Sequence, residues 1–77
     1  MTIDELMRDI APKMRKGWVY IDDQQRLCYS DEKPCLVSSR YADGRPFNRW
    51  DIVGDILPFD ISPVDDWTQS LRSVGNE

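Results

Sequence analysis

The stretch WVYIDDQQRLCYSDEKPCLVSS, residues 18–39, decides the expected fold class. It holds three short runs rich in aromatic and aliphatic residues, separated by the polar segments DDQQ and DEKP. Trp18 and Tyr20 alternate with Val19 and Ile21, and a period of two is typical of a strand. We therefore expect three short strands, joined by tight turns into one antiparallel meander, at residues 18–22, 26–30 and 35–39.

A helix is expected on each side of this meander. Thr2 followed by Glu5 matches a capping box, and apolar residues recur behind it at helical spacing until Pro12 interrupts the pattern. Near the other end, Ser62 before Pro63 is typical of a helix start. Four apolar residues then share one helical face: Val64, Trp67, Leu71 and Val74. The sequence predicts an α+β fold with an N-terminal helix, a short antiparallel sheet of three or four strands, and a C-terminal helix.

The segment between the meander and the second helix is less regular. Asp43-Gly44 is a turn signal and Pro46 breaks regular structure, so residues 40–50 are expected to form a loop. Residues 48–61 are compatible with helix, strand or loop, and Pro58 would confine a strand there to a sheet edge. A chain of 77 residues allows one small domain, residues 1–77.

Residue content argues against catalysis. The chain has no histidine, which excludes Ser-His-Asp triads and Cys-His dyads, and its four glycines form no phosphate-binding loop. Cys28 and Cys35 lack the further ligands that a zinc site needs, so both are expected to be structural thiols in the core. Asp51 and Asp55 would lie one turn apart on a helix, where they could bind a divalent ion or act in hydrolysis, but a solvated acidic face is more common. We expect no enzyme activity, no cofactor, no metal ion and no small-molecule substrate.

The acidic residues gather in the last third of the chain. Residues 51–77 hold six acids and one base, a net charge of −5, whereas residues 1–50 carry +1. Such a tract can be a solvated surface without a partner, or a surface that meets a basic protein. On a helix, its spacing would also resemble the phosphates of DNA. The candidate contact residues of this tract are Asp51, Asp55, Asp60, Asp65 and Asp66.

The segment 40–50 is a second candidate contact surface. It combines arginines with aromatic residues, the types that are enriched at protein hot spots and at single-strand nucleic-acid sites. A net charge of −4 and a pI near 4.6 favour a protein partner, and direct nucleic-acid binding by the segment 40–50 is the alternative. For Trp50 a core role and a hot-spot role are equally open. The candidate contact residues here are Tyr41, Arg45, Arg49 and Trp50.

The chain is expected to act in the cytoplasm as a monomer or small homo-oligomer. No run of apolar residues approaches the 18 or so that a membrane helix needs, and the first ten residues, MTIDELMRDI, lack the apolar core of a secretory signal. We therefore expect no membrane association.

Three fragments, KGWVYID, YSDEKP and VDDWTQSLR, give the chain a resemblance to small accessory proteins of bacteriophages and prophages, which include anti-CRISPR proteins. The resemblance implies a non-catalytic protein that binds and inhibits a host defence protein in the host cytoplasm. The acidic surface would then occupy a basic, nucleic-acid-binding site on that host protein. The resemblance supplies no functional residues of its own.

Overall fold

The computed structural model describes residues 1–75, which form one short helix and two antiparallel sheets. Helix α1 spans Ile3–Asp9, and its predicted capping box is present: Glu5 N donates to Thr2 Oγ1 and Thr2 N donates to Glu5 Oε1, both at 3.1 Å. Pro12 lies in the 3₁₀ turn η1, Ala11–Lys13, so the interruption expected at this proline is also confirmed.

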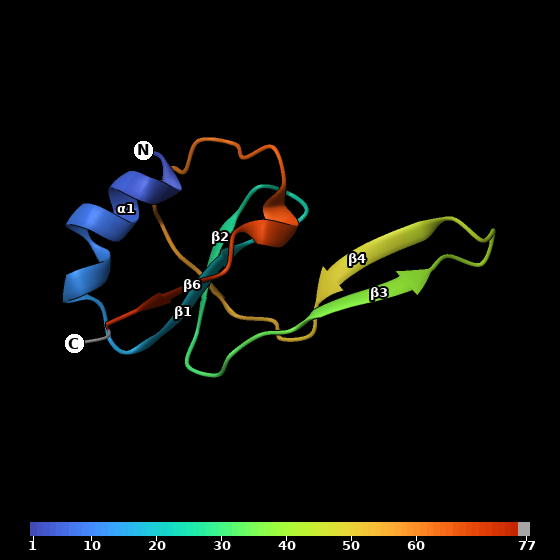
Figure 1. Cartoon of the computed structure of the whole chain (residues 1–77), viewed down its shortest axis with the longest axis horizontal. Helices are drawn as coiled ribbons and strands as arrows, with labels where there is room; N and C mark the ends of the chain where they lie inside the picture. Colours follow the sequence, from blue (N-terminus) through green and yellow to red (C-terminus); the bar gives the residue numbers. More distant parts are fainter. Residues whose placement is uncertain (76–77) are drawn as a thin grey trace.

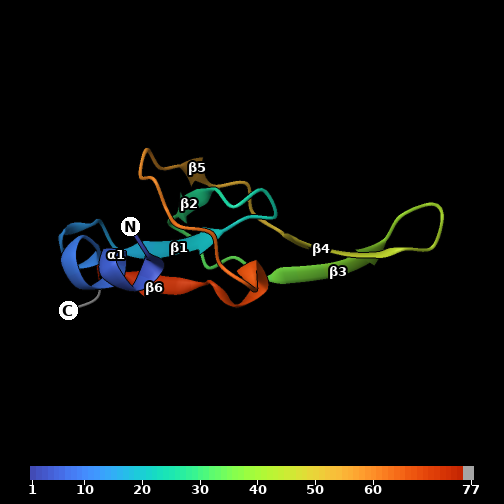
Figure 2. The ribbon, with the colours of Figure 1, turned by 90° about the horizontal axis from the view of Figure 1, so that it is seen from above.

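The body of the molecule is a four-stranded sheet in the order β5-β2-β1-β6 (Figures 1 and 2; β5 is labelled in Figure 2). Its strands are β1 (Gly17–Ile21), β2 (Leu27–Ser30), β5 (Asp55–Ile56) and β6 (Arg72–Val74). Both faces of β1 and β2 are buried. On one face, Val19 and Ile21 form a cluster with Leu6 of α1. On the other face, Tyr20 and Cys28 form a smaller cluster with Trp50.

The second sheet is a two-stranded hairpin that projects from the body (Figures 1 and 2). It consists of β3 (Leu36–Arg40) and β4 (Pro46–Trp50), and we call residues 36–50 the arm and the rest of the described chain the body. The arm makes the molecule elongated, with principal extents of 43, 24 and 18 Å. Most arm residues are exposed to solvent.

The prediction of a C-terminal helix is wrong. Residues 62–66 are irregular, η2 (Trp67–Gln69) is a single 3₁₀ turn, and the chain then enters strand β6 against β1. Ser62 does not cap a helix; its N–H donates to Met1 O at 2.7 Å. Ser70 Oγ accepts the Ile21 N–H at 2.8 Å, so this segment is held by contacts with residues about 50 positions away rather than by local helical bonds. The fold therefore consists mostly of strands, and one short N-terminal helix gives it only a minor α+β character.

The expected single meander is also wrong in its third member. β1 and β2 pair as predicted, from Trp18 opposite Ser30 to Ile21 opposite Leu27. β3 leaves this sheet because β5 and β6 occupy the outer positions beside β2 and β1, and it pairs with β4 instead. The turn around Asp43-Gly44 is thus the end of a hairpin, and most of the expected loop at 40–50 is strand.

Candidate functional site

The register of the arm gives it two different faces. Directly opposed residues of an antiparallel pair lie on the same face, and successive residues of a strand alternate between faces. The pairs Val37–Arg49 and Ser39–Phe47 therefore share one face, and the contact of Tyr41 with Phe47 extends this face to the turn. We call it the aromatic–basic face: Val37, Ser39, Tyr41, Arg45, Phe47 and Arg49. The opposite, polar face consists of Leu36, Ser38, Arg40, Pro46, Asn48 and Trp50.

The tip of the arm is ordered by its own side chains. The rings of Tyr41 and Phe47 lie 4.4 Å apart between centroids, and the Arg45 guanidinium carbon lies 5.3 Å from the Tyr41 ring centroid. Arg45 Nε also pairs with Asp43 Oδ2 at 2.7 Å, which offsets part of its charge. Gly44 closes the turn at φ 88°, a conformation that side chains disfavour. These contacts place an aromatic pair and a guanidinium in a defined arrangement at the far end of the molecule.

The base of the arm is held by Trp50. Its side chain is only 9% exposed, and its Nε1–H donates to Ile21 O at 3.0 Å. The indole lies 5.3 Å from the Tyr20 ring and 6.4 Å from the Trp67 ring, between centroids. The structure thus gives Trp50 a core role, joining the arm to the body.

Further hydrogen bonds fix the chain on both sides of the base. Asp51 Oδ1 accepts the Cys35 N–H at 2.8 Å, and Asp51 N donates to Cys35 O at 3.0 Å, so the two strands stay joined where they meet the body. The Tyr20 hydroxyl donates to Ile52 O at 3.0 Å and accepts the Gly54 N–H at 2.8 Å. Burial raises the pKa of Tyr20, so this hydroxyl keeps its proton at neutral pH.

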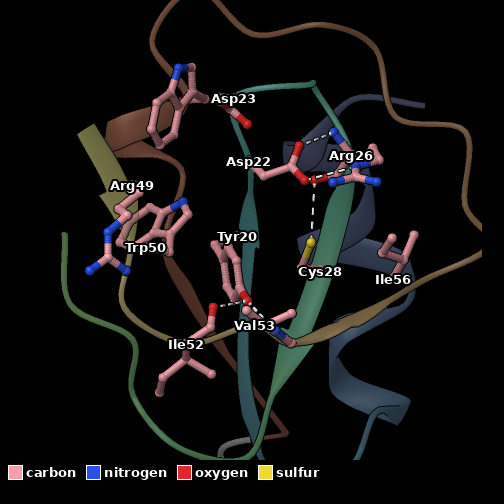
Figure 3. Close-up of a pocket in the computed structure, with 12 residues that line it drawn as sticks. Tyr20, Asp22, Asp23, Arg26, Cys28, Arg49, Trp50, Ile52, Val53 and Ile56 are labelled. Atoms are coloured by element: carbon pink, nitrogen blue, oxygen red, sulfur yellow. Dashed lines mark hydrogen bonds and ion pairs between the residues drawn. The ribbon is translucent and has the colours of Figure 1, made fainter. Parts of the chain in front are cut away.

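A pocket of about 210 Å³ lies beside the base of the arm (Figure 3). Its lining is mainly apolar and includes Tyr20, Trp50 and Trp67, with the fully exposed Val53 at its edge. Asp22 and Arg26 also line it and pair with each other at 2.8 Å. The volume suits one large side chain rather than a cofactor. In the described part of the chain no three His, Cys, Asp or Glu side chains are placed to hold a metal ion.

The two thiols lie in different surroundings. Cys28 is buried in the pocket wall, and burial raises the pKa of its thiol, which favours the unreactive protonated form. Cys35, the residue before the arm, is exposed, so the expectation that both thiols lie in the core is wrong for Cys35. The two cysteines are free.

The acidic tract does not form one regular face. Its five aspartates are all exposed, but residues 51–66 contain no helix, so the helical spacing that would resemble DNA phosphates is absent, as is a helical Asp51–Asp55 pair. Asp51 lies at the arm base, Asp55 on β5, Asp60 beside the N-terminus, and Asp65 and Asp66 before η2. Asp66 also has a structural role, because its Oδ1 accepts the Thr68 N–H at 3.1 Å. The sixth acid, Glu77, lies outside the described residues.

The arm brings together three of the candidate contact residues. Tyr41, Arg45 and Arg49 share the aromatic–basic face, and Trp50 lies on the other face with its side chain in the body. Sequence reasoning did not select Val37, although the alternation of Val37 with Leu36 and Ser38, together with the Asp43-Gly44 turn, was a usable hairpin signal.

Comparison of the chain with protein-family models, with curated proteins and with solved structures gives no match. Within residues 1–75, no helix has the length and apolar character that crossing a bilayer requires.

Proposed function

We propose that this protein is a non-catalytic binding protein that contacts another protein through the aromatic–basic face of its arm. The observation that carries this proposal is that the arm is held at its base and ordered at its tip while Tyr41, Arg45 and Arg49 of its aromatic–basic face are exposed. An isolated hairpin is only marginally stable in water. Here the buried indole of Trp50 holds the base and the Tyr41–Phe47 pair orders the tip. Such pre-organisation lowers the entropic cost of binding.

Residue types on this face favour a protein partner. Tyrosine and arginine are enriched at hot spots, and Tyr41 is 52% exposed while Arg49 is exposed beside the half-buried Val37 and Phe47. The arm edges add unpaired backbone groups, which a strand of another protein can use.

The charge of the body, and not that of the arm, favours a partner with a basic surface, because the arginines of the aromatic–basic face would repel such a surface. The arm carries three arginines and one aspartate, a net +2, so the rest of the chain carries seven bases and thirteen acids, a net −6. A negative body would speed association with a basic, nucleic-acid-binding surface of a host protein, and the resulting complex would weaken as salt screens the charges. In the phage-type role implied by the resemblance, binding would block that host site.

The test is a pull-down from bacterial lysate with matched arm variants as baits. The aromatic–basic-face variant combines Tyr41→Ala with Arg49→Ala. The control variant combines Arg40→Ala with Asn48→Ala, which changes the same arm by the same net charge on its polar face. We expect a protein that is retained by the wild type and the control, lost by the face variant, and released progressively by salt. Equal recovery by all three baits would refute the role of this face.

Single-stranded nucleic acid is a second candidate partner, because Tyr41, Phe47, Arg45 and Arg49 lie on one face in an arrangement suited to stacking and phosphate contact. An electrophoretic shift at low salt, present for the wild type and lost on Arg49→Ala, would favour this candidate. The body's charge of −5 opposes it.

A further inference from the structure

The arm has two outer edges, and they differ in what they offer to another strand. Tyr41 N donates to Arg45 O, and Asp51 N donates to Cys35 O. The pairs 41–45 and 35–51 are therefore hydrogen-bonded pairs of the ladder. Bonded and non-bonded pairs alternate in an antiparallel ladder, so 36–50, 38–48 and 40–46 are the non-bonded pairs. The backbone C=O groups of these six residues, and the N–H groups of all of them except Pro46, therefore point outward.

On the β4 edge, Pro46 occupies one of the outward positions. Proline has no N–H, and a proline on an outer edge is a common protection against strand addition. On the β3 edge, the outward residues are Leu36, Ser38 and Arg40, and each can both donate and accept. Leu36 is 39% exposed, and Ser38 and Arg40 are exposed as well. In the described chain β3 has no neighbour other than β4.

We propose that β3 pairs with β3 of a second copy of this chain in an antiparallel, two-fold symmetric dimer centred on Ser38. The two arms would then form one four-stranded sheet in the order β4-β3-β3-β4. Ser38 of each copy would exchange both backbone hydrogen bonds with Ser38 of the other, and Leu36 would do the same with Arg40 of the other copy.

The β3 sequence is self-complementary in this register. Arg40 lies opposite the aliphatic Leu36 of the second copy rather than opposite another arginine, so no like charges oppose each other. Ser38 lies opposite Ser38, a small hydroxyl pair that fits across strands. An isologous contact of this kind closes on itself and does not propagate into a filament.

Charge favours the same arrangement. Antiparallel pairing places the tip of each arm, with Arg45, beside the segment that leads into β3 of the other copy. That segment carries the exposed acids Asp31 and Glu32 and the exposed Lys33, a net −1, and the arm carries +2 against −5 on the body. The aromatic–basic faces of the two arms would lie on the same side of the joined sheet and stay open, so the dimer does not depend on the proposed function.

The sharpest test is disulfide trapping across the two-fold axis. In a Cys35→Ser background, Ser38→Cys places the two sulfurs in a bonded antiparallel pair, whose Cα separation of about 5.5 Å allows a disulfide. Asn48→Cys is the matched control, since Asn48 is the cross-strand neighbour of Ser38 and the two copies of Asn48 would lie three strand spacings apart, about 14 Å. Under mild oxidation we expect a covalent dimer from Ser38→Cys at least ~10-fold faster than from Asn48→Cys, because the axis raises the effective thiol concentration.

A reversible measurement uses charge at the same two positions. Ser38→Lys and Asn48→Lys each remove the Ser38 Oγ to Asn48 Oδ1 hydrogen bond of 2.8 Å and add one charge to the polar face. Only Ser38→Lys brings two lysines together at the axis, so sedimentation should show a dissociation constant about fivefold higher for Ser38→Lys than for Asn48→Lys. A wild type that remains monomeric up to about millimolar concentration refutes the dimer. Equal trapping at positions 38 and 48 refutes the β3 register.

Discussion

Replacement of Trp50 by alanine tests whether the arm is held by its base. The indole is 9% exposed, contacts Tyr20 and Trp67, and donates to Ile21 O. A buried tryptophan covers about 150–250 Å². At about 25 cal/mol per Å² its removal costs roughly 4–6 kcal/mol of stability, an upper bound because the unfolded chain already buries some of this area. We expect a loss of about 3–5 kcal/mol.

That loss approaches the whole stability expected of so small a core, which rarely exceeds about 3–5 kcal/mol. The Trp50→Ala variant should therefore be largely unfolded at 25 °C, and Trp50→Phe is the more informative change. It keeps a ring but removes the Nε1–H and part of the buried area, and should cost about 1–3 kcal/mol. Urea unfolding followed by far-ultraviolet circular dichroism gives both values.

The matched control is Tyr41→Ala at the tip, where the ring is 52% exposed and should contribute about 1 kcal/mol or less. A Trp50→Ala protein that unfolds within about 1 kcal/mol of the wild type would refute the reasoning, since an indole buried at the arm base cannot be removed so cheaply. If such a variant also failed to bind the partner, Trp50 would be a contact residue instead.

Four further measurements test the body. Tyr20→Phe leaves one backbone C=O and one N–H without their hydroxyl partner and should cost about 1–3 kcal/mol in urea unfolding, whereas Tyr41→Phe should cost less than about 0.5 kcal/mol. Gly54→Ala would put a Cβ 2.6 Å from the Tyr20 hydroxyl and closer still to a backbone carbonyl, and should lower stability by about 1–3 kcal/mol. Cys35 should react with a thiol reagent in the native state and Cys28 only on unfolding; equal rates would contradict the burial of Cys28. The pKa values of Cys28 and Tyr20 are raised in the folded state, so the native state holds more protons than the unfolded state in alkali. The free energy of unfolding should therefore fall as pH rises above about 9. A flat profile from about pH 8 to 11 would contradict this.

The elements that the sequence predicted correctly are those set by neighbouring residues. The capping box at Thr2 and Glu5 and the alternation through β1 and β2 are local signals, and both elements formed as expected. The C-terminal helix failed because its signal competed with distant contacts: Val64 and Trp67 pack on the core without a helix, and Val74 pairs with Gly17 in the sheet. Nothing near Ser62 in the sequence reveals that the β1 edge is free to take β6.

The candidate site could be predicted only in its residue types. Arginine beside tyrosine in the segment 40–50 indicated a contact surface, and Tyr41, Arg45 and Arg49 do share a face. Their grouping depends on the pairing of β3 with β4. Asp43-Gly44 is a hairpin signal, but we interpreted the segment as a loop. The aspartates were expected to act together, but only a helix through residues 51–66 would have aligned them, and that segment follows the sheet edge and the N-terminus instead.

The distribution of packing along the arm explains where a partner is expected. Stabilising contacts lie at the two ends, with Trp50 in the body and Tyr41 against Phe47 at the tip. The middle is more exposed: a side-chain hydrogen bond links Ser38 and Asn48, and Val37 is only half-buried. The contacts within such a hairpin stabilise its exposed central section only weakly. Pairing at the edge of β3 would stabilise that section, because each added strand supplies backbone bonds and same-face neighbours, and would leave the aromatic–basic face open to a different partner.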